Sequence, residues 1–306
     1  MVSVYAYIRI YDPVGSAINQ KNSDFGKKLD EQSDGTGNFS FEKVMKDSNR
    51  INVLLVGLEH SRTDTIMIAS YDRDDKIANI VSIPRDTYYY REGRTGGSLK
   101  INAIYGQEGL ESLISAVEEI AGIPIHKHVL IGYEGLVKGV DALGGVEVDI
   151  QEGGLHYEDP YQDLYIHIPG GRQLLNGENS LKALRCRHSY AGGSDLERIA
   201  FQQQWVKAVV GKLISFKLPA FLTEVYSYVE TDFSLSELLT LATDAPGFSM
   251  TNFYNQTLPN YHEWIGGVSF VHPDQEKIIE MVYQMYGIID NSTKAGSQED
   301  DAEDEV

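Results

Sequence analysis

The sequence predicts an α/β fold built around a mixed β-sheet. Three apolar runs separated by short polar segments, at 51–57, 65–71 and 76–84, are typical of neighbouring strands. Apolar residues then recur at helical spacing within 107–122. Because strand and helix patterns alternate through residues 51–150, we expect helices packed in layers against a sheet.

The first of these runs, "INVLLVG", is continuously apolar and ends at Gly57, a pattern typical of a strand covered on both faces. The next two runs are joined by the polar segment "DRDD", whose length predicts an antiparallel hairpin. In the helix that follows, Gly122 is suited to the C-cap, and five apolar residues form one face: Leu110, Leu113, Ile114, Val117 and Ile120.

The remaining expected elements alternate less regularly. Asp195 is suited to the N-cap of the longest helix. In chain order we expect a strand at 126–133, a helix at 134–145, a strand at 146–150, a loop-rich region at 151–182, helices at 195–216, 218–230 and 234–244, an edge strand at 265–271 and a helix at 273–287.

The composition limits the classes of function. The chain has 306 residues and a net charge of −19, and six of its acidic residues lie in the segment from Glu299 to Glu305. Residues 1–48 are interpreted as an extension or linker, and residues 292–306 as a disordered acidic tail. A nucleic-acid-binding protein needs a basic surface, and no Lys/Arg-rich cluster is present, so we expect no nucleic acid partner.

Cysteine and histidine give little evidence of chemistry. Cys186 is the single cysteine, which excludes an intramolecular disulfide, and it is interpreted as a core-facing strand residue. The "HKH" segment at 126–128 is interpreted as structural, because no third zinc ligand lies near it. No segment approaches the roughly 20 apolar residues of a membrane-spanning helix.

Charged residues gather where the expected strands and helices end. Arg62 and Asp64 follow the first strand, and Arg85 and Asp86 end the third. The full set of cations is Arg62, Arg85, Lys100, Arg185, Arg187 and Arg198, and the neighbouring acids are Glu59, Asp64, Asp86 and Asp195. In α/β sheets, ligands bind where strand ends open into loops.

Two interpretations of these charges are open. Any single pair is most simply a structural ion pair. Six cations at element ends in an acidic protein instead favour a clustered anion such as a pyrophosphate, because guanidinium groups bind such oxygens bidentately. Carboxylates in the same cluster would repel that anion unless a hard cation such as Mg²⁺ bridges them. The residues alone therefore indicate a phosphorylated ligand with a metal.

Seven motifs in this order resemble the LytR–CpsA–Psr family of bacterial cell-wall proteins: "INVLLVGLE", "RTDTIMIAS", "IVSIPRDTY", "KINAIYG", "GGVEVDI", "LNGENSLKALRCRH" and "DLERIAFQQQ". The resemblance implies a three-layer α/β/α sandwich with a mixed central sheet over residues 49–291. It implies a phosphotransferase that moves a phosphoglycopolymer, such as teichoic acid or capsule polysaccharide, from a polyprenyl-pyrophosphate lipid to a peptidoglycan sugar hydroxyl. The implied cofactor is Mg²⁺ or Mn²⁺. The implied location is the extracellular face of the bacterial membrane, at the membrane surface, with an anchoring helix outside this chain.

The resemblance also assigns roles to individual residues. Asp64 and Glu59 are implied as metal ligands, Asp86 as a supporting acid, and Asp195 as the group that activates the acceptor hydroxyl. The implied pyrophosphate-binding residues are Arg62, Arg85, Lys100, Arg185, Arg187, Arg198 and Gln202, of which Arg62, Arg85, Arg187 and Arg198 are also implied in catalysis. Two positions depart from the family pattern: Glu59 stands where Asp is usual, and Phe201 stands where an arginine is common.

A prenyl chain needs an apolar slot, expected between the sheet and its helices. Candidate lining residues are Leu110, Leu113, Val137, Val140, Ile199, Trp205, Val206 and Val209. Three other functions are weighed against transfer: a non-catalytic scaffold that binds the lipid carrier or the wall, a polyprenyl-pyrophosphate pyrophosphatase, and a transcriptional regulator. The regulator ranks last because no basic helix-turn-helix is evident.

Overall fold

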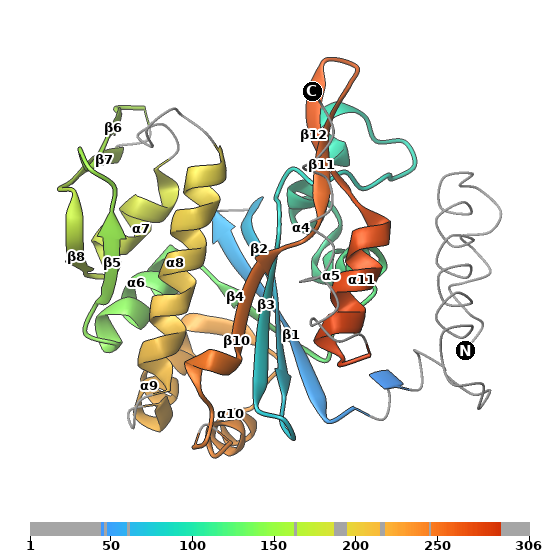
Figure 1. Cartoon of the computed structure of the whole chain (residues 1–306). Coiled ribbons are helices and arrows are strands. Elements are labelled where there is room, and N and C mark those ends of the chain that lie inside the picture. The colour runs from blue at the N-terminus through green and yellow to red at the C-terminus, as the bar shows by residue number, and fades with distance from the viewer. Residues whose placement is uncertain are drawn as a thin grey trace, which may run out of the picture.

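The computed structural model describes residues 44–45, 48–59, 62–161, 164–186, 195–214, 218–244 and 246–288, with the side chains of α8 described from Phe201 onward. The expected extension at 1–48 and the expected acidic tail at 292–306 lie almost wholly outside these ranges. Figure 1 shows a central sheet with helices on both of its faces. The fold is therefore the expected three-layer α/β/α arrangement.

The central sheet has six strands among the described residues, in the order β10-β3-β2-β1-β4-β9. Strand β2 runs antiparallel to β1 and β3, β4 runs parallel to β1, and β10 runs parallel to β3. The strand β9 at one edge is antiparallel to β4. Their bounds are β1 Arg50–Glu59, β2 Arg62–Asp72, β3 Ile77–Ile83, β4 Lys127–Ile131, β9 Val229–Thr231 and β10 Phe253–Thr257.

One face of this sheet carries the main hydrophobic core. Alternate strand residues such as Leu54, Ile68 and Val81 are fully buried there, as the period of a strand requires. They pack against the helices α5 (Leu110–Ala121) and α11 (Gln275–Met285), together with the turn η2 Ile101–Ala103 and the short helix α4 Ile104–Glu108. The turn η1 Gly96–Leu99 precedes them in the chain.

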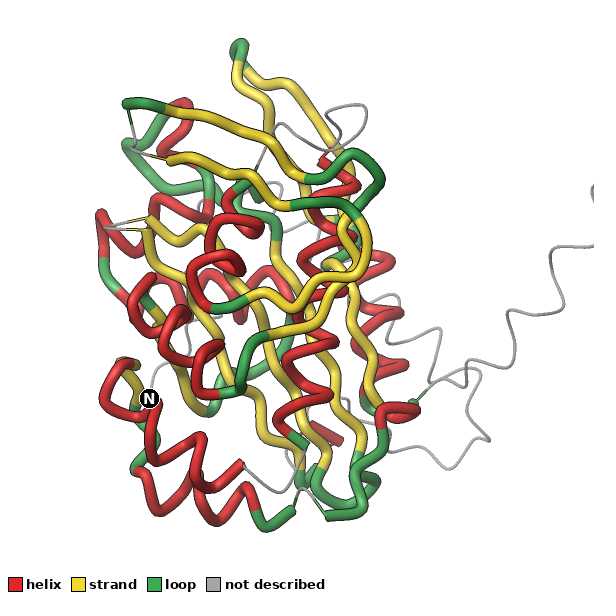
Figure 2. The backbone as a smooth tube through the Cα atoms, turned by 90° about the vertical axis from the view of Figure 1, so that its left-hand side faces the viewer, coloured by secondary structure: helices red, strands yellow, loops and turns green. Residues whose placement is uncertain are grey.

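The other face is covered by a second set of helices, namely α6 Tyr133–Ala142, α7 Gly177–Arg185 and α8 Asp195–Leu213. Figure 2 turns this side of the molecule toward the viewer. A second buried cluster joins these helices to the two-stranded sheets β5–β8 and β6–β7. The strand bounds are β5 Val146–Ile150, β6 Leu155–Asp159, β7 Leu164–Ile168 and β8 Gly171–Leu175.

The central strands are packed unequally on their two faces. None of the residues in the second cluster comes from the central sheet. On the face that points toward α6 and α8, six of the apolar strand residues are only half-buried: Val53, Leu55, Met67, Ala69, Val129 and Ile131. Apolar area between two separate cores therefore stays partly accessible.

The region 151–182 was expected to be loop-rich, and this prediction was wrong. It contains three strands, β6, β7 and β8, and most of α7. The strands are short and, among the strands that the structure describes, β6 and β7 pair only with each other. Exposed polar residues such as His156 and His167 alternate with buried ones, so few apolar residues mark the strand period. Cys186 was expected on a strand, but it is the C-cap of α7, although it is buried as expected.

The C-terminal third also differs in detail from the prediction. Instead of one helix over 218–230, α9 (Leu218–Val225) is followed by the turn η3 Tyr226–Tyr228 and by strand β9. The helix α10 spans Leu235–Ala242 and begins with a capping box between Ser234 and Glu237. The expected edge strand at 265–271 is a hairpin of β11 (Asn260–Ile265) and β12 (Val268–Pro273), preceded by the turn η4 Met250–Asn252 and by the unexpected strand β10.

None of the helices that the structure describes combines the length and the apolar composition that crossing a bilayer requires.

The contact between α6 and α7 generates a stability prediction. A Cβ atom at Gly177 would lie 2.3 Å from the carbonyl oxygen of Val137, and backbone atoms cannot move aside cheaply. We expect Gly177→Ala to lower the free energy of unfolding by about 1–3 kcal/mol, measured by urea denaturation. Gly211→Ala in α8 is the matched control, since its Cβ would meet nothing within 4 Å, and it should raise stability by about 0.5–1 kcal/mol. Equal effects of the two substitutions would contradict this packing.

Candidate functional site

Several of the predicted charged residues that the structure describes lie at one edge of the central sheet. Strands β1, β3 and β4 all run in the same direction and end at this edge, where β2 begins. Ile66 lies opposite Ile83, so two residues further along Asp64 faces Arg85. The pairing of these four strands thus brings side chains from four chain segments to the same edge.

The first pair joins β2 to the segment after β3. An Nη of Arg85 donates to the Asp64 carboxylate at 3.1 Å, and about three quarters of each side chain is buried. The Nε of Arg85 is buried and has no hydrogen-bond partner among the described residues. A guanidinium has five donors, so Arg85 retains donors for a ligand while Asp64 holds it in place.

The second pair joins β1 to the end of α7. The last residue of β1, Glu59, accepts from Arg185 at 3.1 Å. The guanidinium of Arg185 also lies over the ring of Tyr133, 4.9 Å from its centroid. Arg185 is the last residue of a helix. It reaches the site because α7 ends beside the edge of the sheet.

Tyr133 is a member of the site that the sequence analysis missed. Burial is the main cause of its raised pKa, and the adjacent Glu59 carboxylate raises the pKa further, with a smaller contribution from Asp64. Glu59 is paired with Arg62, two residues before Asp64, so the two ion pairs lie next to each other at this edge. The signal was present in the sequence, since Tyr133 ends the expected strand at 126–133 and follows the same strand-end rule.

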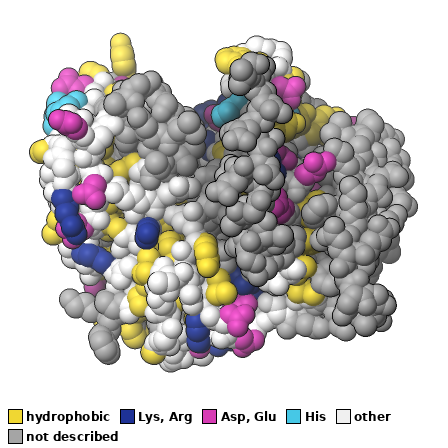
Figure 3. Space-filling model, viewed as in Figure 1, with side chains coloured by type: hydrophobic (Ala, Val, Ile, Leu, Met, Phe, Trp, Pro, Cys, Tyr) yellow, Lys and Arg dark blue, Asp and Glu magenta, His cyan; other side chains and the backbone are white. Residues whose placement is uncertain are grey.

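A third ion pair lies next to the cluster. The Lys100 ammonium is 3.2 Å from the Asp86 carboxylate. Asp86 follows Arg85 directly, so this pair borders the same edge. Arg62, in register with Glu59 at the start of β2, has an exposed side chain. Basic side chains are visible in the hollow at the upper end of the molecule in Figure 3.

The other predicted residues come from α7 and α8. Gln202 is half-buried on α8, while Phe201 is 6% exposed and belongs to the second hydrophobic cluster. Arg187 lies outside the described residues, and so do the side chains of Asp195 and Arg198, whose backbone belongs to α8. Their predicted roles stay predictions.

The start of α6 adds to the electrostatics of this edge. The helix begins at Tyr133, directly after β4, with Gly132 as its N-cap. The first backbone N–H groups of a helix carry partial positive charge and favour anions. Together with the guanidinium groups, this helix end makes the edge suitable for a negatively charged ligand.

The donor chemistry at the site fits a hard divalent cation. Among the described residues, no group of three His, Cys, Asp or Glu side chains is arranged to hold a metal by itself. Mg²⁺, however, is commonly held by one or two carboxylates, with phosphate oxygens and water as further ligands. Asp64 and Glu59 supply two carboxylates to one cluster, so they fit a metal that binds together with a phosphorylated substrate.

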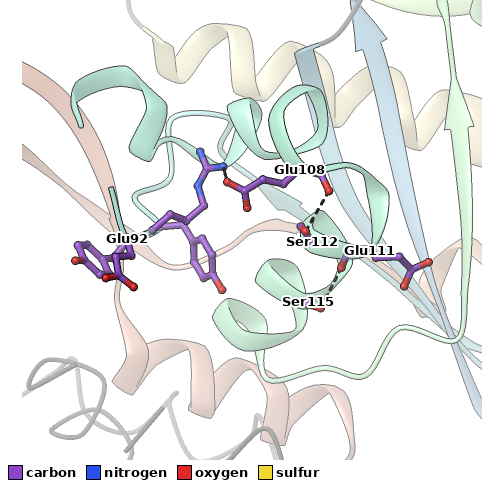
Figure 4. Close-up of a pocket in the computed structure, with 8 residues that line it drawn as sticks. Glu92, Glu108, Glu111, Ser112 and Ser115 are labelled. Carbon is purple, nitrogen blue, oxygen red and sulfur yellow. Dashed lines mark hydrogen bonds and ion pairs between the residues drawn. The ribbon is translucent and has the colours of Figure 1, made fainter. Parts of the chain in front are cut away.

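A separate polar cavity is not suited to the same ligand. It has a volume of about 470 Å³ and lies between the segment 89–92 and the start of α5. Figure 4 shows Glu92, Glu108 and Glu111 around it, with the hydroxyls of Ser112 and Ser115 donating to helix carbonyls. Arg91 also lines the cavity and is paired with Glu108, while Glu92 and Glu111 add negative charge that would repel a pyrophosphate.

The predicted slot residues are divided between the two faces of the sheet. Leu110 and Leu113 pack in the core with α5, whereas Val140, Trp205 and Val209 pack in the second cluster. The prediction that they share one slot was therefore wrong. The half-buried strand residues on the α8 side, such as Leu55 and Met67, were not predicted to line the slot. Because their apolar side chains are partly accessible, they are better placed to contact a lipid chain.

Comparison with known proteins identifies the family. A model described as the LytR_cpsA_psr family matches residues 13–287. The chain belongs to this family.

Two relatives and one solved structure illustrate the similarity. The polyisoprenyl-teichoic acid–peptidoglycan teichoic acid transferase TagU of Oceanobacillus iheyensis is 28% identical over 288 residues, covering 88% of this chain and 84% of TagU. The cell wall biosynthesis protein LcpA of Corynebacterium glutamicum is 30% identical over 263 residues, covering 75% of this chain but only 48% of LcpA. This chain thus spans about half the length of LcpA. The crystal structure of B. subtilis TagV has a TM-score of 0.65 at 25% identity, covering 79% of this chain and 98% of TagV.

The position of Tyr133 generates a pH prediction. Its pKa is raised, so at pH values above about 10 the unfolded chain loses this proton while the folded protein keeps it. The contribution of Tyr133 to stability is therefore complete below pH 10 and is lost as the pH rises toward the folded-state pKa. We expect Tyr133→Phe to lose less stability than the wild type between pH 9 and about 11, measured by urea denaturation. An identical loss in both proteins would contradict the raised pKa.

Proposed function

We propose that this protein transfers a phosphoglycopolymer from a polyprenyl-pyrophosphate lipid to a sugar hydroxyl of peptidoglycan. The observation that carries the proposal is the cluster in which Arg85 and Arg185 are held by Asp64 and Glu59 at one edge of the sheet. Family membership supports the reaction class, and TagU and TagV relatives are named as teichoic acid transferases. The proposed site of action is the outer face of the bacterial membrane.

The chemistry is a phosphoryl transfer. The acceptor hydroxyl oxygen bonds to the sugar-linked phosphorus, and the bond from this phosphorus to the bridging oxygen breaks. The bridging oxygen leaves with the lipid as a polyprenyl monophosphate, and the hydroxyl proton passes to a base, for which Asp195 is the proposed group. Negative charge grows on the leaving phosphate, so preorganised cations are the main source of acceleration.

The position of each residue at the site suggests a role in the reaction. Arg85 and Arg185 would bind the two phosphates, because both guanidinium groups lie at this edge and a guanidinium is suited to bidentate binding of phosphate oxygens. Lys100 and Arg62 would add positive charge at the rim. The carboxylates of Asp64 and Glu59 would hold Mg²⁺ or Mn²⁺, which supplies charge neutralisation to the pyrophosphate when bound. The half-buried apolar face beside α8 would take part of the prenyl chain.

The central test replaces Arg85. We expect Arg85→Ala to lower the transfer rate from a lipid-linked oligosaccharide to peptidoglycan by on the order of 10²–10³-fold, because a charge that stabilises the transition state is lost. Arg85→Lys should lie between this variant and the wild type, since it keeps the charge but not the fork.

The matched control is Arg73→Ala, which breaks an Arg–Asp pair with Asp244 at the opposite end of β2. It should transfer at the wild-type rate, and thermal unfolding should show all variants folded. Full transfer by Arg85→Ala would defeat the catalytic proposal and favour a binding scaffold. Release of inorganic or sugar-linked phosphate without an acceptor, and no transfer with one, would instead favour a pyrophosphatase.

A second prediction concerns the metal. We expect a chelator to abolish transfer and added Mg²⁺ to restore it, and Asp64→Asn should need at least tenfold more Mg²⁺ for half-maximal rate, because one charged ligand is lost. Asp244→Asn, at the other end of β2, is the control and should show the wild-type Mg²⁺ requirement. Unchanged transfer in the presence of chelator would refute the metal requirement.

A further inference from the structure

The hairpin of β11 and β12 ends in an unusual apolar tip. Trp264 is 72% exposed and Ile265 is 40% exposed, and both precede a turn of Gly266 and Gly267. A tryptophan is rarely left so exposed in a soluble domain. The sequence alone predicts only an edge strand here.

The tip of the β11–β12 hairpin extends away from the rest of the domain. Gly266 and Gly267 both have positive φ, at 56° and 81°, which suits a two-residue hairpin turn that other residues would strain. At its base the hairpin is fixed: Phe270 is buried, and Val271 exchanges backbone hydrogen bonds with Asp86 and Tyr88. Figure 1 shows the hairpin extending beyond the end of the sheet at which β1 finishes.

Exposure on both sides of the hairpin decides what kind of partner fits it. Successive strand residues point to opposite faces, so Trp264 and Ile265 lie on different faces of the hairpin, and both are exposed. The tip therefore has exposed apolar surface on both faces. No charged residue occurs from Trp264 to Val271. A flat protein partner would cover one face, whereas lipid can surround both.

We propose that the β11–β12 tip inserts into the interfacial region of a lipid bilayer and holds the charged edge of the sheet at the level of lipid phosphates. This inference rests on the proposed function, because it concerns the access of a membrane-borne lipid pyrophosphate to the site. Tryptophan is suited to this role, since its ring is amphipathic and is enriched at membrane interfaces.

The dimensions agree with this orientation. Val271, which is hydrogen-bonded to Asp86, lies five residues from Gly266, and five strand residues span about 17 Å. An interfacial segment enters about 5–10 Å into the boundary between headgroups and acyl chains. The residues beside Asp86 would then stand on the order of 10 Å outside that boundary, near the headgroups, where a lipid pyrophosphate is found.

The test uses tryptophan emission, because the chain contains only two tryptophans. In Trp205→Phe, Trp264 is the sole emitter, and we expect its emission to shift to shorter wavelength with phosphatidylcholine vesicles containing some phosphatidylglycerol. Brominated acyl chains should quench it. In Trp264→Phe, only Trp205 emits, and neither effect is expected. No shift and no quenching in Trp205→Phe would overturn the proposal.

A partition measurement gives the magnitude. Trp264→Ser should lower binding of the whole chain to these vesicles about tenfold in sedimentation, with little effect of salt, since the contact is apolar. Leu174→Ser is the matched control, because Leu174 is 64% exposed but lies on β8 away from the tip, and its binding should not change. Equal binding of Trp264→Ser and the wild type would overturn the proposal. So would a change only in self-association without lipid, which would make the tip a protein contact.

Two transfer assays separate this inference from the proposed function. With a water-soluble short-chain pyrophosphate donor, Trp264→Ser should match the wild type, and with a long-chain donor in vesicles it should be slower. If the wild type transfers neither donor but Trp264 still enters vesicles, the proposed function fails and the membrane contact stands. If the wild type transfers both donors and Trp264→Ser does so equally, the membrane contact fails alone.

Discussion

The register of the central sheet is the constraint on which the candidate site depends. Asp64 meets Arg85 because β2 and β3 are paired so that Ile66 faces Ile83, and Glu59 lies beside Tyr133 because β1 and β4 are paired so that Gly57 faces Ile131. A slip of one residue in either pairing would turn these side chains to the opposite face. The buried alternate residues of β1, β2 and β3 fix the register, so packing of the core also positions the charges.

The charges in the cluster are balanced in a way that suits reversible anion binding. Two carboxylates hold two arginines at about 3 Å, with roughly a quarter of each side chain exposed. A partly buried cation without a partner would be costly, and a fully buried pair would be hard to separate. The carboxylates thus keep the guanidinium groups oriented at the edge of the sheet. Tyr133 lies beside the second pair, with the guanidinium of Arg185 over its ring.

The two faces of the central sheet differ in how completely they are packed. One face is packed into a continuous core with α5 and α11, which gives the domain its rigidity. The other face keeps apolar residues such as Leu55 and Met67 half-buried between that core and the second cluster around α8. The charged edge and the exposed hairpin tip lie at the same end of the sheet, and the apolar face lies on its α8 side. This arrangement is consistent with a substrate that has a charged head and a lipid tail.

The α/β class, the first three strands and most of the charged residues at strand ends were predictable from the sequence, because these depend on local periodicity and on chain position. The tertiary structure alone decided that Arg185 reaches Glu59 from the end of a helix, that Tyr133 joins the cluster, and that Leu113 and Val209 lie on opposite faces of the sheet. It also showed β10 and the strands of 151–182, whose short or exposed segments carry little periodic signal. Residues that are distant in the chain come into contact only through strand pairing and helix packing. The local sequence pattern does not indicate which residues these are.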